Sequence, residues 1–242
     1  MSGHSKWATT KRAKATVDAK RAAVFTKLSN LITIAAKEKG GDPTTNFTLR
    51  MAIDKAKLAN MPKDNIERAI KRGIGENNGQ QIEELVYEGF GPAKSQFVIK
   101  CLTDNRNRAA SNIRHIFAKH GGALGSVMWN FSQKGVIRIS KEEMEKAKIE
   151  PENLELELID AGAQDISLAE EGMTIFTKVE DLQLVNKFLE NKNLKSETAE
   201  IEFIAKEEQA IEEGEKEKIE KFIEELEDSE DVNEYYNNIS NI

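Results

Sequence analysis

Lysine and arginine residues crowd the start of the chain, beginning with the string Gly-His-Ser-Lys-Trp at residues 3–7. Basic side chains at this density attract phosphate groups and release counterions, which gives an affinity that depends on salt and little on base sequence. Trp7 lies beside Lys6 in a polar segment, where its indole either stacks on a base or fills a gap in a helical domain. The segment predicts polyanion binding, with a merely solvated face as the alternative, and its candidate contact residues are Lys6, Trp7, Lys11, Arg12, Lys14, Lys20, Arg21 and Lys27.

The net charge of −7 conceals an asymmetry between the two ends of the chain. Residues 1–75 contain sixteen Lys and Arg against six Asp and Glu, a net charge of +10, so the rest of the chain is strongly acidic. A basic domain on an acidic body is typical of a protein that touches nucleic acid with one end only. Further candidate contacts in this basic region are Lys63, Arg68, Lys71 and Arg72.

A second basic motif lies in the segment 102–122, where Arg106, Arg108 and Arg114 belong to a predicted helix. Arg106 and Arg108 fall in its first turn, where the helix dipole disfavours cations by up to about 1 kcal/mol each. Such a cost favours a compensating anion nearby. Asp104 is one candidate, and a phosphate or an acidic patch of another domain is the other.

The sequence offers little support for catalysis. The histidines are His4, His115 and His120, and a spacing of five puts the last two on different faces of a helix. HExxH, CxxC, Walker and GxSxG patterns do not occur, and the single cysteine, Cys101, lies in an apolar run that predicts a buried, unreactive thiol. We therefore expect a protein that is not an enzyme, with no metal site, cofactor or small-molecule substrate.

The distribution of apolar residues argues against a membrane location. No stretch approaches the roughly 20 apolar residues of a membrane span, and the N-terminal residues lack the hydrophobic core of a signal peptide. A single cysteine also fits a reducing compartment. We expect a cytoplasmic protein with no membrane partner.

Helical periodicity dominates the first 75 residues. Apolar residues predict helices over 17–39, 46–59 and 62–72, with the pair Gly40-Gly41 ending the first and Gly73 capping the third. The polar, glycine-containing linker 75–81 follows and should let the basic domain reorient. These residues predict a three-helix domain over 1–78.

The remainder of the chain alternates strands and helices. Strands are predicted near 85–87, 96–99 and 127–131 with a helix over 105–120, and residues 135–204 read β-α-β-β-α-β, the ferredoxin-like order. A C-terminal helix over 209–226 and a strand over 232–237 lack a partner for their apolar stripe unless they return to residues 82–134. The predicted fold is therefore α+β with three domains: residues 1–78, an α+β domain from 79–134 with 207–242, and an inserted ferredoxin-like domain over 135–206.

Long strings of this sequence resemble the YebC/PmpR family, among them residues 3–7, 60–73, 87–92 and 102–122. The resemblance implies a helical domain and two ferredoxin-like α+β domains, the third inserted in the second, and no catalytic activity. Members are described as DNA-binding transcriptional regulators, whereas other evidence on the family points to the ribosome, and a mitochondrial relative is a translational activator. The chain departs from the family pattern at 22–23 and 93–94 and has a shorter loop near Gly125.

These observations predict a non-enzymatic regulator of gene expression that binds nucleic acid, with DNA-binding transcriptional regulation as the first interpretation. The alternative is a translation factor that binds ribosomal or transfer RNA on the ribosome and relieves stalling or activates translation. It needs only basic surface and shape complementarity, whereas promoter recognition needs side chains that read base edges. A third class is a protein adaptor whose basic domain pairs with its own acidic body.

Overall fold

The computed structural model describes residues 19–76, 81–147 and 151–241. The first described elements are three helices, α2 (Ala19–Lys39), α3 (Phe47–Leu58) and α4 (Lys63–Gly73). Asn46 caps α3 by accepting a hydrogen bond from the Leu49 amide at 3.0 Å, and Gly40 ends α2 with a φ of +89°. The predicted apolar stripes meet in one core, whose buried residues include Leu28, Ile32, Ala35, Leu49, Ala52, Ile53, Ala56, Ile66 and Ala69.

Gly73 serves packing in this domain and is not the cap that its position suggested. It is the last residue of α4, and a Cβ atom built on it would lie 2.4 Å from the Thr33 carbonyl oxygen and 2.7 Å from the Ala36 Cβ atom. The left-handed backbone position after α4 belongs to Gly75, whose φ is +82°. Gly73 therefore lets α4 approach α2 closely.

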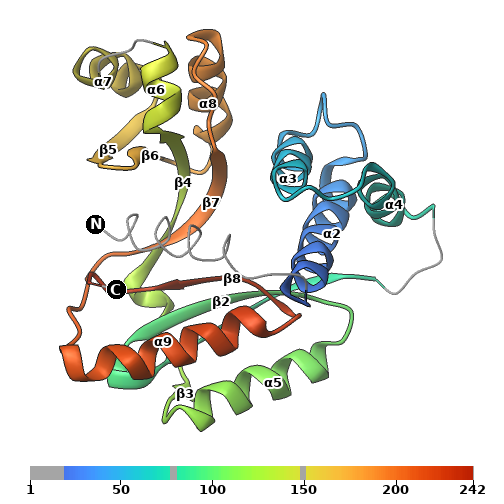
Figure 1. Cartoon of the computed structure of the whole chain (residues 1–242), viewed down its shortest axis with the longest axis vertical. Helices are drawn as coiled ribbons and strands as arrows, with labels where there is room; N and C mark the ends of the chain where they lie inside the picture. Colours follow the sequence, from blue (N-terminus) through green and yellow to red (C-terminus); the bar gives the residue numbers. More distant parts are fainter. Residues whose placement is uncertain (1–18, 77–80, 148–150, 242) are drawn as a thin grey trace. The chain divides into compact units, whose positions relative to one another are not determined.

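The second domain is a four-stranded sheet with helices on one face (Figure 1). Its elements are β1 (Glu83–Phe90), the 3₁₀ turn η1 (Pro92–Lys94), β2 (Gln96–Thr103), α5 (Arg106–Lys119), β3 (Ala123–Leu124), α9 (Glu213–Asp228) and β8 (Val232–Asn237). The strand order is β3-β1-β2-β8, with antiparallel neighbours. The C-terminal segment thus returns to pair with β2, as its apolar stripe predicted.

The core of this domain forms between α5, α9 and the sheet. Phe222 of α9 makes edge-to-face contacts with Phe97 of β2 at 4.9 Å and with Phe117 of α5 at 5.1 Å between ring centroids. The stripe residues Ile211, Ile219, Ile223 and Leu226 are buried in the same cluster. These contacts hold segments of the chain that are more than 100 residues apart.

The strand expected over 127–131 is not present as such. Met128–Asn130 form the 3₁₀ turn η2, and strand β4 begins only at Phe131. The Glu88 carboxylate accepts hydrogen bonds from the Val127 and Met128 amides at 2.6 Å each, which turns the chain at this point. A run of Val, Met, Trp and Phe resembles a strand, but the carboxylate of a distant residue decides its conformation.

The third domain contains β4 (Phe131–Ser140), α6 (Lys141–Ala147), α7 (Pro151–Asp160), β5 (Ala163–Ala169), β6 (Gly172–Thr177), α8 (Leu182–Asn191) and β7 (Thr198–Ala205). The sheet order is β5-β6-β4-β7, the order of a ferredoxin-like fold. Residues 132–204 form one compact unit. Helix α6 was not predicted, because Met144 is its one buried apolar residue and gives no periodic stripe.

The predicted fold class is confirmed: the chain is α+β, with an N-terminal three-helix domain and two ferredoxin-like α+β domains, the third inserted in the second. The second domain differs from the third in the order of its elements, because its central strands β1 and β2 form a hairpin. The residue limits 1–78, 79–134 with 207–242, and 135–206 stay predictions. Within the described ranges, no helix is long and apolar enough to cross a membrane.

Candidate nucleic-acid interface

Nearly half of the predicted contact residues fall at the N-terminus. Lys6, Trp7, Lys11, Arg12 and Lys14 lie outside the described residues, and Lys20 and Arg21, near the start of α2, have side chains that are likewise not described. The candidates that can be placed are therefore Lys27, Lys63, Arg68, Lys71, Arg72, Arg106, Arg108 and Arg114.

Lys27 points into the fold. Its ammonium group donates a hydrogen bond to the carbonyl oxygen of Glu227, in the last turn of α9. Burial lowers the pKa of Lys27, and the negative charges of Glu227 and Asp228 oppose that shift. A cation at a helix C-terminus interacts favourably with the helix dipole, so Lys27 stabilises the C-terminal end of α9.

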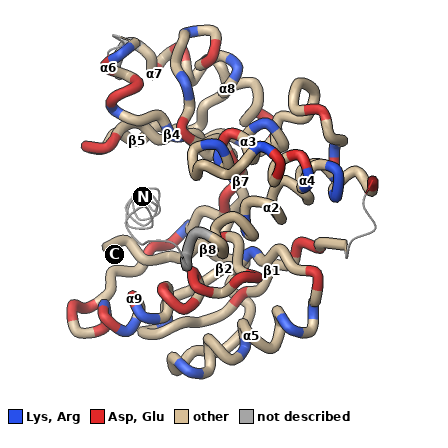
Figure 2. The backbone as a smooth tube through the Cα atoms, turned by 45° about the vertical axis from the view of Figure 1, so that its right-hand side comes forward, with Lys and Arg blue, Asp and Glu red and all other residues tan. Residues whose placement is uncertain are grey.

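Helix α4 presents its cations to solvent. Lys63 is 87% exposed and pairs with Glu67 at 3.5 Å, and Arg68 donates from Nε to the Asp64 carbonyl oxygen at 3.2 Å. Lys71 is exposed in the last turn, where Arg72 also lies. Figure 2 shows basic and acidic residues interspersed along this helix. Exposed ion pairs of this kind contribute about 0–1 kcal/mol, so these side chains can turn to phosphates at little cost.

The same charge pattern recurs at the ends of the neighbouring helices. Each of α2, α3 and α4 carries two cations in its last turn: Lys37 and Lys39, Lys55 and Lys57, and Lys71 and Arg72. Gly41, just after α2, faces Ile70 and Ile74 of the α4 end, so the α2 and α4 ends lie together. Lys39 is also exposed at the end of α2, although it was not among the predicted contact residues.

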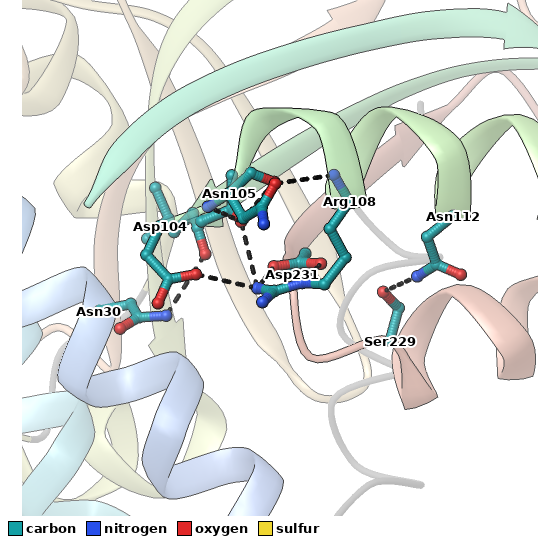
Figure 3. Close-up of polar contacts among 9 residues, drawn as sticks. Asn30, Asp104, Asn105, Arg108, Asn112, Ser229 and Asp231 are labelled. Atoms are coloured by element: carbon teal, nitrogen blue, oxygen red, sulfur yellow. Dashed lines mark hydrogen bonds and ion pairs between the residues drawn. The ribbon is translucent and has the colours of Figure 1, made fainter. Parts of the chain in front are cut away.

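Arg106 and Arg108 of α5 pair with acids of the same domain, and Figure 3 shows the contacts of Arg108. Arg108 donates to Asp231 at 2.7 and 3.2 Å and to Asp104 at 3.1 Å, while the exposed Arg106 pairs with Glu83 at 3.0 Å. Of the two anions that the sequence left open for Arg108, an internal carboxylate is the one observed. The sequence suggested Asp104, and the closer partner, Asp231, had no local signal.

The Asp231 carboxylate is the centre of this arrangement. Its side chain is 8% exposed, and burial alone would raise its pKa, but hydrogen bonds from Arg108 and Thr103 outweigh burial and lower the pKa. The same hydrogen bond to Asp231 raises the pKa of the Arg108 guanidinium. Asn105 caps α5 by accepting from the Arg108 amide at 3.0 Å, and Asn112 donates to the Ser229 hydroxyl at 2.9 Å. These bonds fasten α5 to the segment that joins α9 to β8.

Arg114 is the third predicted contact residue on α5, and its side chain is exposed. Burial raises the pKa of Tyr87, and the positive charges of Arg106 and Arg114 oppose that shift. All three of these arginines are exposed, the Arg106 side chain to 69% and the Arg108 side chain to 54%.

The cysteine, the histidines and the acids are the remaining groups that could do chemistry. Across the residues with described positions, no group of three or more His, Cys, Asp and Glu side chains is arranged to hold a metal ion. Cys101 is buried, and burial raises the pKa of its thiol to about 12. His120 bonds to Glu225 at 2.7 Å and packs its ring against Phe222.

Comparison with known proteins gives matches along nearly the whole chain. A model of the TACO1/YebC protein N-terminal domain matches residues 5–76, and a model of the TACO1/YebC second and third domain matches residues 82–239. Proteins named probable transcriptional regulatory protein are 45% identical in Thermoanaerobacter pseudethanolicus, over 99% of this chain and 97% of the relative, and 46% identical in Bacillus licheniformis, over 99% and 100%. The crystal structure of a conserved hypothetical protein from Aquifex aeolicus matches with a TM-score of 0.82 and 38% identity, over 94% of this chain and 93% of that one.

Proposed function

Because this chain belongs to the TACO1/YebC family, we propose that it is a non-enzymatic, cytoplasmic regulator of gene expression that binds nucleic acid, acting as a DNA-binding transcriptional regulatory protein. The names of its relatives, which cover the full length, support a regulatory role. The first domain, with its basic N-terminal segment, is the proposed contact surface.

The observation that carries this proposal is the different use of cations in the first two domains. Arg108 of α5 is bound to Asp231 and Asp104, and Arg106 is paired with Glu83, so these cations act within the fold. The exposed cations of α4 make only local contacts on their own helix, and the residues before α2 add further positive charge. A polyanion would therefore find available cations on the first domain.

A second candidate is an RNA- or ribosome-binding translation factor. The exposed side chains of α4 include Asp64 and Glu67 among the cations. Carboxylates repel the phosphates that flank a DNA groove, which weakens α4 as a recognition helix for base edges. Binding to structured RNA asks only for cations and shape complementarity.

The test replaces Lys11, Arg12 and Lys14 together with alanine. Removing three cations that bind phosphates should flatten the slope of log affinity against log salt by up to about 2.7 on duplex DNA, and by less on single strands. The matched control replaces Lys216, Lys218 and Lys221 with alanine, since these three lysines pair with Glu213, Glu215 and Glu217 on α9. The control should leave the slope unchanged.

Binding would be measured to promoter DNA, to RNA and to ribosomes at matched salt. Unchanged salt dependence in the folded N-terminal variant contradicts the proposed contact surface. A loss of RNA or ribosome binding, with promoter DNA never bound above the non-specific level, favours the translation factor over the transcriptional regulator.

A further inference from the structure

Trp129 is an exposed aromatic residue in the turn η2 of the second domain. Its side chain is 58% exposed, and that of Phe90, at the end of β1, is 38% exposed. Scattered exposed apolar residues are normal on protein surfaces, so exposure alone indicates no site. A binding site at Trp129 is indicated by the residues around it.

The backbone around Trp129 is fixed on both sides. Glu88 holds the Val127 and Met128 amides, and Val127 is fully buried. On the other side, the Asn130 side chain donates to the Gln96 side chain at 2.7 Å and to the Glu207 carbonyl oxygen at 2.9 Å, and accepts from the Glu207 amide at 2.9 Å. Trp129 is therefore the exposed member of a buried and hydrogen-bonded turn. A ligand that covers it meets a backbone that is already ordered.

Two exposed lysines belong to the segments that are hydrogen-bonded to this turn. Lys206 donates from Nζ to the Trp129 carbonyl oxygen at 2.8 Å. Lys94 lies in η1, two residues before the Gln96 that Asn130 holds. Glu207 and Glu208 follow Lys206 directly, so the electrostatic attraction at this site is modest. Binding energy here must come mainly from the indole face.

We propose that Trp129 is a stacking platform for a base of single-stranded nucleic acid, with Lys206 beside it to meet an adjoining phosphate. The inference rests on the proposed function for its class of partner. Every base has a flat π-face, and stacking on an aromatic side chain needs no particular base sequence. A duplex keeps its base faces stacked inside, so this site selects single strands, whereas the N-terminal cations attract either form.

The experiment uses the full chain with Trp7→Phe, because the chain has two tryptophans and this change leaves Trp129 as the one fluorophore of its kind. Oligo(dT), oligo(U) and a duplex of equal length are titrated in turn. The single strands should quench the fluorescence of Trp129, and the duplex should not.

Trp129→Ala should weaken single-strand binding about 5-fold to 160-fold, the range that one stacked base contributes, and should leave the salt slope unchanged. Trp129→Phe should recover part of the affinity, which separates stacking from a folding defect. The control is Leu184→Ala, which truncates another exposed apolar side chain, 60% exposed on α8, and should leave binding unchanged.

The outcomes separate this inference from the proposed function. If single strands bind with no quenching and Trp129→Ala binds them normally, the stacking site is wrong, whatever the N-terminal variant shows. Binding to duplex alone likewise overturns the stacking site and leaves the proposed function standing. If Trp129→Ala loses a protein partner while its oligonucleotide affinity is unchanged, Trp129 is a protein contact instead. Unchanged salt dependence in the N-terminal variant, combined with quenching and affinity loss at Trp129, supports the stacking site and contradicts the N-terminal contact surface.

Discussion

Helices α4 and α5 both carry several cations, yet these cations have different surroundings in the two helices. Lys71 and Arg72 lie in the last turn of α4, where the helix dipole favours positive charge. Arg106 and Arg108 lie in the first turn of α5, where the dipole opposes it. Lys71 is exposed in the last turn of α4, whereas Arg108 in the first turn of α5 is bound by Asp231 and Asp104. The acids that approach Arg108, and not its position in the helix alone, set it apart, because Lys63 lies in the first turn of α4 and is 87% exposed.

The largest effect that would test this comparison is expected from Asp231→Ala. The change leaves Arg108 without its closest partner and removes the acceptor for Thr103, so the free energy of unfolding should fall by about 1.5–3 kcal/mol. Urea denaturation followed by circular dichroism measures it. Asp160→Ala, at an exposed carboxylate on α7, is the control and should change little.

The loss of stability caused by Asp231→Ala should also depend on pH. The folded-state pKa of Asp231 lies below its ordinary value of 3.8, so its contribution is complete above that pH and disappears as pH falls through the lowered pKa. The stability difference between the wild type and Asp231→Ala should therefore be constant from about pH 5 to pH 8 and shrink below about pH 4. An equal difference at pH 3 and pH 7 would show that the carboxylate charge is not what holds Arg108.

An intermediate effect is expected when Lys63, Arg68 and Lys71 of α4 are replaced together with alanine. Nucleic-acid affinity should become less sensitive to salt. The slope of log affinity against log salt should flatten by up to about 0.9 for each duplex phosphate that these side chains no longer neutralise. Arg106→Ala removes an α5 cation that pairs with Glu83 and should leave the slope unchanged. The comparison fails if an α5 substitution alters salt dependence as much as the α4 variant does.

The smallest effect is expected from Arg106→Ala. Its ion pair with Glu83 joins two exposed side chains, of which Arg106 is 69% exposed, so unfolding free energy should fall by only about 0.2–1 kcal/mol. The difference should diminish in high salt because exposed charges are screened. If Arg106→Ala lowered the unfolding free energy as much as Asp231→Ala, Arg106 would have the same structural role as Arg108.

Most of the fold follows from local sequence signals. The stripe of Leu49, Ala52, Ile53 and Ala56 predicted α3, and the residues 232–237 were predicted as a strand and form β8. Such elements depend on residues close in sequence, whose periodicity can be read directly. The turn η2 could not be predicted, because Glu88, which shapes it, is 39 residues away from Val127.

The candidate site was predictable only in part, for the same reason. The sequence located the cations and indicated that Arg108 needs an anion. It did not identify Asp231, which is 123 residues away and approaches only because β8 returns to pair with β2. Whether a lysine or arginine is available to a ligand depends on such distant neighbours.

The place of the inserted domain in the chain bears on the order in which the chain folds. Strands β2 and β8 must pair although more than 120 residues separate them, which requires closing a long loop. Strands β4 and β7 are neighbours in their own sheet, and the Ser132 hydroxyl reaches the Ile204 carbonyl oxygen at 3.5 Å. Once the inserted domain has folded, its two ends lie about one strand spacing apart, about 4.8 Å. The loop that β2 and β8 must close then still contains α5, β3 and α9 but no longer the residues of the inserted domain. Earlier folding of the insertion therefore lowers the entropic cost of completing the domain that hosts it.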